Sequence, residues 1–68
     1  MNALNARERM VAWLFENNLK TWEEAVKQAA REYLRAAHCG TSEEAKTWDM
    51  RVRFFLRMYD EKRRFPIT

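Results

Sequence analysis

Residues 21–45, TWEEAVKQAAREYLRAAHCGTSEEA, predict two helices joined by a tight turn. Thr21 and Thr41 are each followed three residues later by a glutamate, which is the capping-box spacing that marks the start of a helix. Gly40 lies directly before the second of these boxes, and we expect it to end the preceding helix in a left-handed conformation. Alanine occupies four positions of the apolar row between the two boxes, so another helix is expected to approach this one closely.

The whole sequence predicts three helices. Two of them form this unit, and the other precedes it in the chain. The central helix spans about 22–39. A first helix is expected over about 6–17, with Asn5 as its N-cap and an asparagine pair at its end. The third helix is expected over about 42–64, since Pro66 disfavours a helical conformation in the residue before it. It is the longest of the three.

These elements define an all-α fold class. The expected loops of about four and two residues are typical of antiparallel neighbouring helices. We therefore expect a single domain over residues 1–68, built as a three-helix antiparallel arrangement with a long C-terminal helix.

The length of 68 residues makes such a domain marginal, because small chains bury a small share of their surface. Cys39 is the single cysteine, so an intrachain disulfide is impossible. The nine aromatic residues (three Trp, two Tyr and four Phe) favour dense packing instead. Oligomerisation is the other common means by which small domains gain stability.

The third helix carries apolar residues on two opposite sides. One row has normal core spacing and is expected to face the other helices: Ala45, Trp48, Val52, Phe55, Leu56 and Tyr59. The other row, which we call the Met–Phe stripe, consists of Met50, Phe54 and Met58 and lies roughly opposite. Phe65 would continue it in a longer helix.

Three interpretations of the Met–Phe stripe remain open. Methionine-rich apolar faces adapt to partner surfaces, so a homodimer through the third helix is the simplest functional interpretation. A surface reserved for a different protein is the second. In the third, the stripe is intrachain core, because the third helix lies between the other two.

Positive charge is concentrated at the C-terminal end, although the whole chain has a net charge of only +3. Arg53 and Arg57 are predicted to flank the Met–Phe stripe and to belong to the same partner interface. The other basic residues of this region are candidate contacts to phosphate or to an acidic partner: Arg51, Lys62, Arg63 and Arg64. A nucleic-acid-binding regulator is therefore the alternative function, although glutamates at the start of the third helix disfavour a helix-turn-helix.

Enzymatic and cofactor chemistry have little support in the sequence. His38 and Cys39 are adjacent, and no second histidine or cysteine exists to complete a zinc site. We expect no enzyme activity, no cofactor and no metal. The longest apolar run, residues 10–15, is much shorter than a membrane span, and no signal peptide is visible. The expected location is the cytoplasm.

In general type the chain resembles the small helical accessory proteins of temperate phages and other mobile elements. Three polar residues that open helices, Asn5, Thr21 and Thr41, carry this resemblance together with the Met–Phe stripe. The resemblance implies a cytoplasmic, often dimeric protein that acts by binding a host protein. It implies no particular site residues. The expected function is thus a non-enzymatic regulator that self-associates and modulates a partner protein through its third helix.

Overall fold

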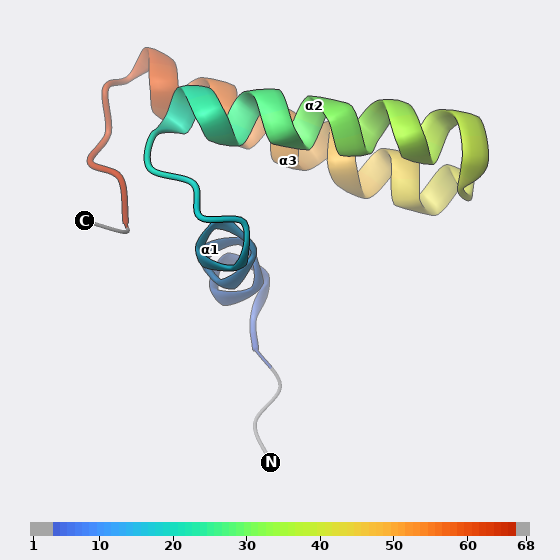
Figure 1. Cartoon of the computed structure of the whole chain (residues 1–68), viewed down its shortest axis with the longest axis horizontal. Coiled ribbons are helices and arrows are strands. Elements are labelled where there is room, and N and C mark those ends of the chain that lie inside the picture. Colours follow the sequence, from blue (N-terminus) through green and yellow to red (C-terminus); the bar gives the residue numbers. More distant parts are fainter. Residues whose placement is uncertain (1–3, 67–68) are drawn as a thin grey trace.

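The computed structural model describes residues 4–66, which form three α-helices and no strand. The helices are α1 (Ala6–Glu16), α2 (Trp22–Cys39) and α3 (Ser42–Asp60). Figure 1 shows α2 and α3 side by side as an antiparallel hairpin, with α1 seen almost end-on beneath it. The predicted all-α, three-helix class is confirmed. The antiparallel prediction holds for α2 and α3 and is wrong for α1, which crosses the hairpin.

All three predicted N-caps are confirmed. The side-chain oxygens of Asn5, Thr21 and Thr41 each accept a hydrogen bond from the backbone N–H three residues on. The reciprocal half of the capping box forms only at α1, where the Asn5 N–H donates to Glu8 Oε1 at 3.2 Å. At α2, the Glu24 carboxylate accepts instead from the N–H of Lys20 at 3.0 Å.

The predicted stop of α1 at its asparagine pair is also confirmed. Asn18 has a left-handed φ of 55°, and the N–H of Leu19 donates to the Leu14 carbonyl at 3.1 Å. This is the Schellman arrangement, in which apolar residues on the two sides of the stop pack together. Leu14 and Leu19 are both buried in the core, so the cap also sets the direction in which the chain enters α2.

Gly40 does not adopt the left-handed conformation predicted for it. Its backbone is extended, with φ −108° and ψ −166°. An added Cβ would lie 2.7 Å from Glu44 Oε2, at the flexible end of its side chain, and 3.0 Å from the Ala36 carbonyl oxygen, so a larger residue fits there only if both neighbours shift. Only two residues connect α2 to α3, so the reversing backbone must pass close to both helix ends.

The third helix ends at Asp60, four residues before the predicted end. Lys62 takes a left-handed φ of 55°, and the N–H of Arg63 returns to the Met58 carbonyl at 3.0 Å. The Arg63 carbonyl then accepts a hydrogen bond from Trp22 Nε1 at 2.8 Å, and the Phe65 ring meets the Trp22 ring edge-on at 4.9 Å. These contacts require the chain to leave the helix and turn toward Trp22 at the start of α2.

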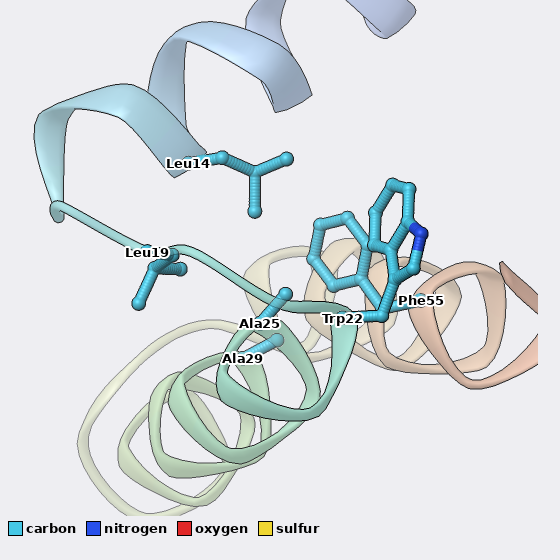
Figure 2. Packing of buried hydrophobic residues seen from close by; sticks show 6 residues of the cluster. All are labelled: Leu14, Leu19, Trp22, Ala25, Ala29 and Phe55. Atoms are coloured by element: carbon cyan, nitrogen blue, oxygen red, sulfur yellow. The ribbon is translucent and has the colours of Figure 1, made fainter. Parts of the chain in front are cut away.

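The core lies where α1 crosses the hairpin. Its buried members come from all three helices and the first loop, as Figure 2 shows: Leu14, Leu19, Trp22, Ala25, Ala29 and Phe55. Phe55 is completely buried, and its ring lies 5.8 Å from that of Trp13 and 5.9 Å from that of Trp22. One side chain of α3 thus contacts aromatic rings of both other helices.

Small side chains allow α2 to pack closely in this core. Ala25 and Ala29 are completely buried on the side of α2 that faces the core, as the sequence predicts. A larger side chain at either position would overlap the neighbouring helix or α1, and such overpacking typically costs about 1–3 kcal/mol.

The matched substitutions Ala29→Leu and Ala37→Leu test this packing. Ala29→Leu is expected to lower the free energy of unfolding by about 1–3 kcal/mol. Ala37 is exposed on the same helix, so the same substitution there should change it by less than about 0.5 kcal/mol. Urea unfolding followed by circular dichroism measures both. Equal losses at the two positions would contradict the described packing.

Candidate protein-binding groove

The crossing of α1 over the hairpin divides the Met–Phe stripe. Met50 is 70% exposed, and Phe54 is 36% exposed. Met58 is half-buried and packs against the core, as does Phe65. The intrachain interpretation therefore describes the C-terminal end of the stripe, while its N-terminal end lies open to solvent.

The exposed end of the stripe forms one wall of a groove, which we call the α1/α3 groove. Its volume is about 320 Å³, and its lining residues come from two helices: Ala6, Arg9, Met10, Thr47, Met50, Arg51 and Phe54. Methionine supplies two of these side chains and phenylalanine a third, so the floor is apolar and adaptable. The groove exists because α1 runs across α3 and leaves an inner corner between them.

Two arginines form the polar rim of the α1/α3 groove, and no carboxylate is among its lining residues. The Arg51 guanidinium lies over the Trp48 ring at 4.7 Å from its centroid. Partial burial, and secondarily the positive charge of Arg9, lowers the pKa of Arg51. Two like charges therefore face the same groove, and an anionic group bound between them would relieve their repulsion.

A second cavity of about 140 Å³ lies on the other side of α1, beneath the returning C-terminal segment. It shares Met10 and Phe54 with the α1/α3 groove, and its own basic residues are Arg7, Arg63 and Arg64. No acidic residue lines this cavity either. The side of the molecule that carries α1 is thus lined by arginine on both flanks of the helix.

Of the basic residues predicted to contact a partner, Arg51, Arg63 and Arg64 line these two cavities. Arg53 and Arg57, predicted to flank the stripe, do not line either. Arg53 is paired with Asp49 at 3.3 Å, and Arg57 with Glu61 at 2.8 Å. Lys62 adopts the left-handed conformation that follows the end of α3, and it lines neither cavity.

Glu61 links two of these basic side chains at the end of α3. It accepts hydrogen bonds from Arg57 Nε at 2.8 Å and from Arg63 Nε at 2.9 Å. These bonds hold the pKa of the Glu61 carboxyl below its usual range and raise the pKa of Arg57. The positive charge at the end of α3 is therefore partly neutralised. The charges of Arg9 and Arg51 beside Met50 have no carboxylate among the lining residues of their groove.

The predicted core row of α3 is only partly correct. Phe55 is buried, and Trp48 and Val52 pack against the core. Leu56 and Tyr59, expected in the core, are 42% and 50% exposed. They lie on the side of the hairpin opposite α1, because α1 covers one side of the hairpin only. Sequence periodicity locates an apolar row without showing how many of its members a neighbour covers.

The residues considered for metal binding and catalysis are not brought into a site. His38 and Cys39 are both exposed at the end of α2. Within residues 4–66, no three histidine, cysteine or carboxylate side chains are grouped as metal ligands would be. None of the helices described is long and apolar enough to cross a bilayer.

Comparisons of the chain with protein-family models, with curated proteins and with solved structures find no match. The assignment of a site therefore depends on the geometry of the chain itself. Sequence reasoning did not identify Ala6, Arg9 and Met10 as site residues. No local sequence signal identifies them, because the position at which α1 crosses α3, and so brings them beside it, depends on tertiary packing.

Substitutions at the two ends of the Met–Phe stripe should have different effects on stability. Met50→Gln is expected to change the free energy of unfolding by less than about 0.5 kcal/mol, since the side chain is largely in water. Met58→Gln places an amide against the core and is expected to cost about 1–3 kcal/mol. Urea unfolding of both variants provides the measurement. A loss at Met50 as large as that at Met58 would contradict the described burial.

Proposed function

We propose that this protein is a protein-interaction module whose α1/α3 groove binds an acidic amphipathic helix of a partner protein and so modulates that partner. The observation that carries the proposal is the open methionine and phenylalanine floor beneath two arginines. An apolar centre with an arginine rim is the usual composition of a protein interface. A helix laid into a groove by its apolar side is a common form of peptide recognition.

Charge selects an acidic partner. Arg9 and Arg51 face the groove without a carboxylate among its lining residues. The nearest acidic residue in the same row of α3 is Glu43, one turn before Thr47. A partner helix with leucine-like side chains on one side and glutamate or aspartate on its flanks would cover Met50 and Phe54. It would also place negative charge between the arginines.

A second copy of the chain fits the α1/α3 groove less well. In a twofold contact the same surface is used by both subunits, so each arginine rim would meet the other. Repulsion between like charges opposes such a contact. This consideration argues against the homodimer interface predicted at Met50, Phe54 and Met58, and for a heterologous partner at the exposed end of that stripe.

Nucleic acid remains the alternative ligand for the same arginines. A phosphate backbone would contact Arg9 and Arg51 but would leave the apolar floor unused. Because cation–phosphate contacts release counterions, such a complex weakens steeply as salt is raised. An apolar contact with two flanking ion pairs responds much less, which makes salt dependence the distinguishing property.

A charge exchange tests the proposed function. The probe is a synthetic amphipathic peptide with leucine at helical spacing and glutamate on the remaining positions, alongside the same peptide with lysine for glutamate. The wild type should bind the glutamate peptide at least about tenfold more tightly than the lysine peptide. The variant Arg9→Glu/Arg51→Glu should reverse this preference. Fluorescence anisotropy of labelled peptides measures both affinities.

The matched control is Arg31→Glu/Arg35→Glu, which makes the same change in net charge on α2, away from the groove. It should retain the preference for the glutamate peptide. Equal effects of the two double variants would show that the preference follows the net charge of the protein. That result would contradict binding in the α1/α3 groove. Tighter binding of duplex DNA than of the glutamate peptide, with a steep salt dependence, would favour the nucleic-acid alternative.

A further inference from the structure

The hairpin has a second apolar surface, on the side opposite α1. We call it the hairpin face and define it by its large apolar side chains: Val26, Tyr33, Leu34, Leu56 and Tyr59. Val26, Leu56 and Tyr59 line a shallow groove between α2 and α3 together with Glu23 and Lys27. Tyr33 lies seven residues after Val26, and Leu34 lies seven residues after Lys27, which places each on the same side of α2 as a residue that lines this groove. Four of the five defining residues are among the most exposed large apolar side chains of the molecule.

Val26 is half-buried and packs against the core, but no element of the described chain packs over the other side chains of the hairpin face. Figure 1 shows α1 and the returning C-terminal segment on one side of the hairpin, with no described segment on the other. Helical domains are built in layers, because each apolar side of a helix pair is stabilised by packing against another element. Here a second layer packs on one side of the hairpin only. The hairpin face is therefore apolar, like a surface that packs in a core, but no described element packs on it.

The charges beside the hairpin face are balanced, in contrast to those of the α1/α3 groove. On α2, Lys27 pairs with Glu23 at 3.4 Å. On α3, Arg53 pairs with Asp49 at 3.3 Å. Arg53 lies one turn before Leu56 and Asp49 two turns before it, on the same side of the helix. Two further exposed charges border the face, Asp60 one turn after Leu56 and Arg31 one turn after Lys27, so acids and bases are equal in number along it. A twofold-related copy can meet this border without net repulsion, and its acids can approach the bases of the other copy.

We propose that the hairpin face is the self-association surface of this protein, and that its occupant is the hairpin face of a second copy. Two hairpins packed in this way form a four-helix arrangement with Tyr33, Leu56 and Tyr59 of both copies between them. The two α1 helices then lie on the outside of the dimer. Both α1/α3 grooves stay open, so self-association would present the same acidic-helix site twice.

Sedimentation equilibrium on three single variants tests this assignment. Leu34 and Tyr59 are 56% and 50% exposed, so a charged side chain there reaches water without unfolding the chain. The wild type is expected to be a dimer at tens of micromolar. Leu34→Glu and Tyr59→Glu should each weaken the dimer at least about tenfold. Met50→Glu, on the opposite side of the molecule, should leave the dimer constant unchanged.

Circular dichroism of each variant shows whether the helices are retained. If one hairpin-face variant loses them, the dimer constant of the other variant provides the test. A wild type that is monomeric at these concentrations would overturn the proposal. So would dissociation by Met50→Glu with no effect of Tyr59→Glu, which would return the dimer to the Met–Phe stripe. A monomeric wild type leaves the expected charge preference of the α1/α3 groove unchanged, so failure of this proposal can be told apart from failure of the proposed function. A dimer through Met50 would contradict both proposals, because a second copy would then occupy the groove.

Discussion

The arrangement of the molecule depends on the packing of Phe55 between Trp13 and Trp22. Phe55 comes from the middle of α3 and is completely buried, with its ring nearly parallel to that of Trp13. Aromatic side chains bury the largest apolar areas available to a protein, which matters most in a chain of this length. Trp22 in turn holds the C-terminal segment through its hydrogen bond to the Arg63 carbonyl. All three helices and the final turn are thus fixed at one cluster.

The position of this cluster decides which surfaces remain open. Met58 packs against the core that forms where α1 crosses the hairpin, whereas Met50 lies beyond the crossing and stays in solvent. The same crossing brings Arg9 beside Arg51 and creates a groove with unbalanced positive charge. It also leaves the opposite side of the hairpin without a covering layer. Both proposed binding surfaces therefore follow from the position at which α1 packs. The groove is positively charged and is proposed to bind an acidic helix, whereas the hairpin face has balanced charges and is proposed to bind a second copy.

Local chemistry made the helices predictable from the sequence. The three N-caps and the stop at Asn18 follow from side chains that satisfy backbone groups within a few residues. The left-handed conformation predicted for Gly40 by the same local reasoning is wrong, because the two-residue connection between α2 and α3 uses an extended backbone there. The early end of α3 likewise depends on Trp22, a residue 41 positions away from its hydrogen-bond partner.

The candidate site was predictable only in part, for a similar reason. Periodicity indicated an apolar row through Met50 and Phe54, and the structure places both in the α1/α3 groove. It also assigned Leu56 and Tyr59 to the core, where the structure leaves them substantially exposed. A helical repeat shows which residues share a side of a helix. The neighbour that covers that side is determined by the tertiary contacts of α1, which no local pattern encodes.

The central claim is that the molecule has two separate binding surfaces, one on each side of the hairpin. Amide chemical-shift mapping by nuclear magnetic resonance tests it most directly, with one titration by dilution and a second by addition of the glutamate peptide. Dilution is expected to shift the amides around Val26, Tyr33, Leu56 and Tyr59. The peptide is expected to shift those around Arg9, Met10, Met50 and Phe54. If both titrations move the same set of amides, the claim of two surfaces is contradicted.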